Sequence, residues 1–183
     1  MINFLHVPKA AGSFLHEISE RYLETVTYWG HIKKQNVPSP SFCFTRNPYD
    51  RLVSAYFYLR NSETGKEPDA SYRELLMKYM SFKDFVMNIA DDRLNRAIIH
   101  LKPMSHFICD EYGDIAIDKI FKIEDIEKID EYLEGIGIDE KLSDISLNQS
   151  GHKPWRFHMD KEIVREINWI YGKDFELFNY EML

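Results

Sequence analysis

Cysteine is scarce in this chain, with Cys43 and Cys109 as the only two among 183 residues. Two cysteines can build neither a disulfide framework nor a zinc cluster, and Cys43, inside the apolar run SFCFT, is expected to be a buried thiol. Long apolar runs are also missing, since none approaches the roughly 20 residues of a membrane-spanning helix. The short apolar start MINFL is followed at once by HVPK, which argues against a signal peptide. We therefore expect no membrane span and a cytoplasmic location.

An excess of positive charge is absent as well. The formal net charge is -7, from 23 Lys and Arg against 30 Asp and Glu, so a broad nucleic-acid-binding surface is not expected. An anionic ligand would need a local basic pocket, which makes the positions of individual Lys and Arg residues informative. Linkers and internal repeats are missing too, and 183 residues with 44% hydrophobic content can bury one core. The sequence therefore predicts a single domain over residues 1–183.

What the chain does contain is a series of short apolar runs that alternate with helical patterns. The runs INFLHV and FCFT are continuously apolar, as is typical of strands that are covered on both faces. Strands that alternate with helices indicate an α/β fold with a mostly parallel central sheet flanked by helices. The predicted strands are residues 2–7, 25–30, 42–45 and 118–124; the predicted helices are roughly 13–24, 48–60, 126–136 and 161–178, with two over 71–90 and another over 91–100.

The stretch HVPKAAGSF, residues 6–14, follows the first predicted strand directly. Small residues lead to Ser13, which we expect to cap the next helix. Such a turn presents backbone N–H groups at a helix N-terminus, where an anion can be held. Lys9 comes early and Gly12 is the only glycine, so the stretch lacks the Gly-x-x-x-x-Gly-Lys-Ser/Thr signature of magnesium-dependent nucleotide loops. Taken alone, it also fits an ordinary strand–helix turn with a surface lysine.

A second motif, FTRNPYDRLVSAY, places Arg46 at the end of the third predicted strand, with Asn47 as a good helix N-cap. Ligands of α/β sheets bind at the carboxyl ends of the strands, where a guanidinium can fork onto a phosphate. Ser54 lies eight residues further on and could add a hydrogen bond. The alternative is that Arg46 and Arg51 form surface ion pairs, for instance with Asp50.

Together, the two motifs closely resemble sulfotransferases that use 3′-phosphoadenosine-5′-phosphosulfate (PAPS), and more narrowly the carbohydrate sulfotransferases of sulfotransferase family 2, the heparan 2-O and HNK-1 type with their bacterial relatives. The ending YGKDFELFNY is similar to the closing motif of that family. The resemblance is strong over residues 4–58, loose over 98–126 and moderate at the end. It implies a P-loop-like fold, PAPS as donor with the bisphosphate PAP as product, and a hydroxyl-bearing, carbohydrate-like acceptor.

The resemblance also implies roles for individual residues. Lys9 would offset the negative charge that develops on the bridging oxygen of the leaving phosphate, and no metal need be invoked. Ala11 stands where many members have glycine. The loop around the 5′-phosphosulfate would consist of Lys9, Ala10, Ala11, Gly12, Ser13 and Phe14, and the 3′-phosphate would be held by Arg46 and Ser54.

The acceptor hydroxyl needs a base, and a histidine with its ordinary pKa of about 6.5 suits that task. His31 follows the second predicted strand and matches the second histidine of an H-G-H-(I/V) run in the resembling 2-O-sulfotransferases, whereas Trp29 replaces the first. We therefore expect His31 to be the base, against the alternative of a structural strand-end histidine. His6 is expected to be structural, and His100 and His106 are the reserve candidates.

Several alternatives stay open at this point. An ATP- and Mg²⁺-dependent small-molecule kinase and a catalytically silent nucleotide-binding module are the competing functions, and the sequence does not indicate an oligomeric state. Glu124 fits a catalytic carboxylate or, more simply, a helix cap. Lys153, Trp155 and Arg156 could close over the nucleotide or lie in a solvated loop, and the polar segments 61–70 and 139–160 could close over the substrate.

Overall fold

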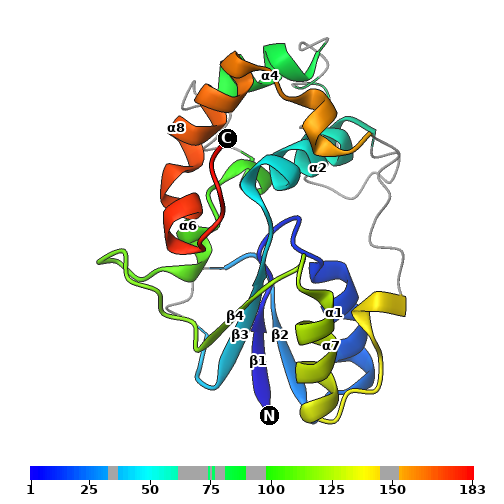
Figure 1. The fold of residues 1–183 in the computed structure, drawn as a ribbon. Helices are drawn as coiled ribbons and strands as arrows, with labels where there is room; N and C mark the ends of the chain where they lie inside the picture. The colour runs from blue at the N-terminus through cyan, green and yellow to red at the C-terminus, as the bar shows by residue number, and fades with distance from the viewer. Residues whose placement is uncertain (33–36, 62–73, 75, 77–80, 90–97, 145–152) are drawn as a thin grey trace. The chain divides into compact units, whose positions relative to one another are not determined.

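The computed structural model groups the chain into two compact units, drawn in Figure 1. The first unit comprises residues 1–46 and 104–148, and the second comprises 47–103 and 149–183. Each is described here by itself, and the prediction of a single domain over residues 1–183 stays a prediction. The structure describes residues 1–32, 37–61, 74, 76, 81–89, 98–144 and 153–183.

A parallel sheet forms the centre of the first unit. Its described strands follow the order β2-β1-β3-β4 and all pair in parallel, which confirms the predicted α/β class with its mostly parallel sheet. Phe4 on β1 lies opposite Tyr28 on one side and Phe42 on the other, and all of β3 is buried. This burial explains why the sequence of β3 is continuously apolar. The strands are β1 (Ile2–Leu5), β2 (Val26–Trp29), β3 (Ser41–Thr45) and β4 (Lys119–Lys122).

The helices α1 (Gly12–Arg21) and α7 (Ile126–Gly135) lie alongside this sheet, and their buried residues complete its core (Figure 1). Arg21, at the end of α1, forms an ion pair of 2.6 Å with Glu140 in the segment that follows α7. This ion pair connects the C-terminal end of α1 to that segment. The expectation that Ser13 caps α1 is wrong. Ala11 is the N-cap and makes no side-chain cap hydrogen bond, so the helix begins before Ser13. The elements are α1 (Gly12–Arg21), α6 (Ser105–Ile108), α7 (Ile126–Gly135) and the 3-10 turn η3 (Leu142–Asp144).

The second unit is helical around an aromatic core. The helices α2, α4 and α8 pack on one another and bury Tyr49, Tyr56, Phe85 and Phe175 to 1% exposure or less. The described elements are α2 (Pro48–Asn61), α4 (Phe82–Ile89), α8 (Lys161–Leu177) and the 3-10 turns η2 (Ile99–Leu101) and η4 (Trp155–His158).

Side-chain caps satisfy backbone N–H groups at the starts of the helices in this unit. The side-chain oxygen of Asn47 accepts the backbone N–H of Tyr49 at 3.0 Å, as expected for the cap of α2. Ser81 Oγ accepts the backbone N–H of Asp84 at the start of α4, and Asp160 caps α8. The helices predicted over 71–80 and most of 91–100 lie outside the described residues, apart from Glu74 and Leu76.

Arg51 corrects one interpretation of the sequence. Its side chain is not at the surface: it is 2% exposed and donates to the backbone oxygens of His100 at 3.3 Å and Lys102 at 2.7 Å. The hydroxyl of Tyr171 donates to the intervening carbonyl of Leu101 at 2.7 Å. Arg51 therefore satisfies buried backbone acceptors next to α2, which the sequence pattern alone could not show.

Replacing Arg51 with Met should lower the free energy of unfolding by about 2–4 kcal/mol, because buried carbonyl oxygens lose their donors. Arg165, exposed on α8, is the matched control, and Arg165→Met should change stability by no more than about 0.5 kcal/mol. Urea unfolding of both variants measures the difference. Equal midpoints would show that the Arg51 contacts add nothing.

Candidate functional site

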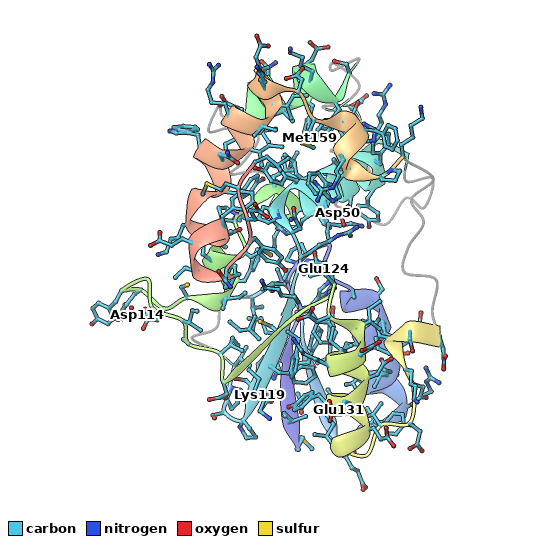
Figure 2. The ribbon with its side chains drawn as sticks, viewed as in Figure 1. Asp50, Asp114, Lys119, Glu124, Glu131 and Met159 are labelled. Carbon is cyan, nitrogen blue, oxygen red and sulfur yellow. The ribbon has the colours of Figure 1, made fainter. Side chains whose placement is uncertain are left out.

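The polar residues singled out from the sequence gather at one edge of the sheet. His6 directly follows β1, His31 follows β2 by two residues and Arg46 directly follows β3. Because the strands are parallel, their carboxyl ends share an edge, and the backbone N–H of His6 donates to the carbonyl of Trp29 at 2.9 Å. Glu124 follows β4 at the same edge (Figure 2). This is the edge at which open α/β sheets bind their ligands.

The loop between β1 and α1 has an unusual backbone. Lys9 (φ 66°) and Ala11 (φ 55°) both adopt the left-handed region, although neither is glycine. Each costs roughly 1–2 kcal/mol relative to ordinary backbone, and such strain collects at functional sites. Left-handed residues in a short turn before a helix point successive N–H groups into one concavity, which suits an anion.

The side chains of this loop divide between the core and the surface. Ala10 is fully buried and Phe14 is 5% exposed, so these two residues can offer an anion only their backbone. Lys9 is half-buried and Ser13 is exposed. The loop therefore combines one cationic side chain with a backbone donor surface.

The ring of His6 leaves room only for glycine at residue 12. A Cβ atom at Gly12 would lie 1.8 Å from both Cδ2 and Nε2 of His6, where no atom can fit. The only glycine of the motif therefore stands where the helix start passes directly over the histidine ring.

Arg46 braces the same loop. Its Nη1 donates to the backbone oxygen of Lys9 at 3.2 Å, and its side chain is half-buried. The guanidinium therefore lies beside the loop that carries Lys9. Two positively charged residues therefore lie at this edge of a protein whose net charge is -7.

His31 belongs to a hydrogen-bonded row. Its Nε2 lies 3.4 Å from Nε2 of His6, and Nδ1 of His6 bonds the hydroxyl of Tyr28. Burial raises the pKa of Tyr28 to about 12, so the hydroxyl is protonated at neutral pH. The sequence motifs did not predict this row. The one signal in the sequence is the two-residue spacing of Phe4 and His6, which puts both side chains on the same face of the sheet. The register then places Tyr28 opposite Phe4 on that face.

Comparison with known proteins decides the family. The model of the sulfotransferase family matches residues 2–181, nearly the whole chain. The chain belongs to the sulfotransferase family. It is thus a PAPS-dependent sulfotransferase, an enzyme that transfers a sulfuryl group from PAPS to a hydroxyl-bearing acceptor. This assignment decides against the kinase and the catalytically silent module.

Among solved structures, the sulfotransferase is similar to mouse sulfotransferase SULT7A1 complexed with PAP, at 14% identity and a TM-score of 0.42. The alignment covers 98% of this chain and 88% of the mouse chain. At these values the likeness carries no argument about the site. No curated protein matches the chain by sequence.

The remaining site predictions concern residues elsewhere in the sulfotransferase. Ser54 lies on α2 in the second unit and is 1% exposed, and its pairing with Arg46 stays a prediction. His100 is 7% exposed in the second unit, with its ring against Tyr58. His106 is half-buried in the first unit, edge-on to Phe107.

Glu124 is exposed, and the N-cap of α7 is its neighbour Asp125, so the expected capping role is not observed. Among the described residues, no helix has both the length and the apolar character needed to cross a membrane.

Trp155 and its neighbours form a layered stack in the second unit. The Trp155 ring lies parallel to Tyr49, with centroids 5.1 Å apart, and the guanidinium of Arg156 lies 4.3 Å above it. Trp155 is therefore packed rather than solvated, whereas Lys153 is exposed with its ammonium 5.8 Å from the ring of Phe157. The segment 62–70 and residues 145–152 of the second polar loop lie outside the described residues.

Two neighbouring substitutions in the loop test its backbone. Gly12→Ala forces a methyl group into the His6 ring, and overpacking of this kind costs about 1–3 kcal/mol, or roughly 2–12 °C in Tm for a chain of this size. Ala11→Gly should change stability by less than about 1 kcal/mol, because relief of the left-handed strain is offset by added freedom in the unfolded chain. Thermal unfolding compares the two, and an equal Tm for both variants would contradict the close approach.

Proposed function

We propose that this sulfotransferase acts on a carbohydrate hydroxyl, with His31 as the general base and Lys9 as the group that stabilises the leaving phosphate. One observation carries the proposal. The first unit places His31, Lys9 and Arg46 at the carboxyl edge of a single parallel sheet, with Arg46 bonded to the backbone of Lys9.

The loop residues fit the sulfuryl donor. Left-handed Lys9 and Ala11 turn backbone N–H groups into a concavity ahead of α1, where an anion can be held. The cradle at Lys9–Phe14 would hold the 5′-phosphosulfate, and Arg46 with Ser54 would hold the 3′-phosphate. When bound, PAPS supplies an activated sulfuryl group with a bisphosphate as the leaving group.

Lys9 is suited to charge stabilisation rather than proton transfer. An ammonium held at the mouth of the cradle offsets the negative charge that builds up on the bridging oxygen as its bond breaks. The Arg46 contact restrains the backbone at Lys9, from which this side chain extends.

His31 is suited to removing the proton of the acceptor hydroxyl. Its ring lies at the same edge as Lys9, and its centroid is 4.2 Å from that of His6, which restrains its orientation. An imidazole, whose ordinary pKa lies near neutrality, is the usual choice for general base catalysis.

The carbohydrate acceptor is proposed from the motif resemblance. The net charge of the chain narrows the class of carbohydrate that we propose. A chain with net charge -7 would repel a highly sulfated polymer. We therefore propose a small glycan, a glycolipid precursor or another small hydroxyl compound as the acceptor class.

An acceptor screen with ³⁵S-labelled PAPS tests this function. Glucose, N-acetylglucosamine, glucuronic acid and N-acetyllactosamine are the probes, and we expect labelled product from at least one. In His31→Ala, kcat should fall on the order of 10²–10⁴-fold, the usual worth of a general base. His106→Ala is the matched variant, since His106 was the other histidine candidate in the same unit. A loss confined to His106→Ala would overturn the assignment of the base, and transfer to none of the four saccharides would contradict a small free saccharide as the acceptor.

Lys9→Met separates charge stabilisation from binding. Because the ammonium acts most strongly as the leaving oxygen gains charge, kcat should fall on the order of 10²–10³-fold, with a smaller change in KM for PAPS. Lys128, an exposed lysine paired with Asp125 on α7, gives the control variant Lys128→Met. A rise in KM with unchanged kcat would mean that Lys9 only binds the donor.

A further inference from the structure

Tyr28, His6 and His31 form a row whose middle ring is held on three sides. Nδ1 of His6 bonds the Tyr28 hydroxyl, and Nε2 of His6 lies 3.4 Å from Nε2 of His31. The third side is Gly12, whose Cα leaves no room for a methyl group against the His6 ring. The row therefore presents both nitrogens of His6 to fixed partners.

The proton count of this row restricts its arrangement. A neutral imidazole carries one N–H, so His6 donates one of its two hydrogen bonds and accepts the other. If Tyr28 donates to His6, then His6 donates to His31, and His31 must carry its own proton on Nδ1. If His31 donates from Nε2 to His6, then His6 donates from Nδ1 to the Tyr28 oxygen, and Nδ1 of His31 is left unprotonated.

Only the second arrangement suits a base at His31. A protonated His31 carries N–H on both nitrogens, and its Nε2–H still meets the bare Nε2 of His6. In the first arrangement, uptake of a proton would set two N–H groups against each other across 3.4 Å. The second arrangement therefore serves both protonation states of His31 without moving any ring.

We propose that His6 is a positioning residue: it accepts the Nε2–H of His31 and so keeps Nδ1 of His31 unprotonated for the acceptor hydroxyl. This inference rests on the proposed role of His31 as the base. In the step, the acceptor O–H bond breaks and its proton forms an N–H bond at Nδ1. The acceptor oxygen forms the new S–O bond, and the old S–O bond breaks with its electron pair going to the bridging oxygen of PAP. His6 keeps its own proton on Nδ1 throughout.

Other charged and titratable groups face this row. The ring of His16 on α1 lies edge-on to Tyr28 with centroids 4.8 Å apart, and its Nδ1 lies 4.0 Å from Glu20. The two positive side chains of the site lie at the same sheet edge. His16 contacts the ring of Tyr28, whereas the hydrogen bonds of the row join Tyr28, His6 and His31. His16→Gln is therefore the control for pH effects. Among the described residues, the charged groups at this edge include Lys9, Arg46 and Glu124.

Nuclear magnetic resonance of the full chain with ¹⁵N-labelled histidine tests the proposal without any acceptor. Long-range ¹H–¹⁵N correlations report which ring nitrogen carries the proton. We expect neutral His31 to be protonated on Nε2 and His6 on Nδ1. A neutral His31 protonated on Nδ1 in the wild-type protein would overturn the proposal, whether or not His31 proves to be the base.

Variants of His6 add a kinetic readout with the saccharide that the enzyme turns over fastest. His6→Asn keeps a polar atom near Nδ1 but removes the acceptor for His31, so kcat should fall about 10–100-fold, as expected for loss of a hydrogen bond to a charged group. The acid limb of the pH–rate profile should move to lower pH, because protonated His31 loses its acceptor. His6→Gln places an amide oxygen near Nε2 and should restore part of both effects, whereas His16→Gln should leave both unchanged.

The outcomes separate the two proposals. Full turnover in His31→Ala would remove His31 as the base, which is a failure of the proposed function. Loss of turnover in His31→Ala with an unchanged rate and profile in His6→Asn would remove only the positioning role. If His6→Asn does not fold, Tyr28→Phe is the second variant: it removes the oxygen that accepts from His6 and should increase the Nδ1-protonated fraction of His31. An unchanged fraction would contradict the proposal.

Discussion

Parallel pairing of β1 with both β2 and β3 is the constraint on which the site depends. It places the residues after three strands at one edge, although they are distant in the sequence. His6 and Lys9 come from the first strand end, His31 from the second and Arg46 from the third. If β1 paired in the opposite direction, the loop that carries Lys9 would leave the sheet at the other edge, away from Arg46.

The loop beyond β1 shows what this arrangement costs. Two non-glycine residues take the left-handed conformation, and the helix start passes over His6 so closely that only glycine fits at residue 12. Such strain persists only where the surroundings hold it. Here the Arg46 hydrogen bond to Lys9 and the burial of Ala10 do so. A rigid loop has its backbone donors in place before an anion arrives, which reduces the ordering cost of binding.

The sequence predicted the parts of the fold that depend on local chemistry. Short runs of strand-forming residues marked the four described strands, and Asn47 marked the start of α2, because caps and burial act over a few residues. The motifs also predicted that Lys9 and Arg46 follow strands whose carboxyl ends share one edge of the sheet. Ser13 is not the cap because the left-handed turn at Ala11 starts the helix earlier. The burial of Arg51 could not be predicted, because the backbone oxygens that accept its hydrogen bonds lie about fifty residues away in the sequence. The Tyr28–His6–His31 row was missed for a similar reason, since it forms only when β1 and β2 pair.

Thermal unfolding with PAP, in EDTA and then in Mg²⁺, tests most directly the central claim that this chain holds a bisphosphate nucleotide without a metal. A ligand at one hundred times its Kd adds about 2.7 kcal/mol, which for this chain length corresponds to a rise in Tm of roughly 5–10 °C. We expect that rise with PAP in both buffers, and a smaller rise with ATP at the same concentration. A rise with ATP and Mg²⁺ alone, or no rise with PAP, would contradict it.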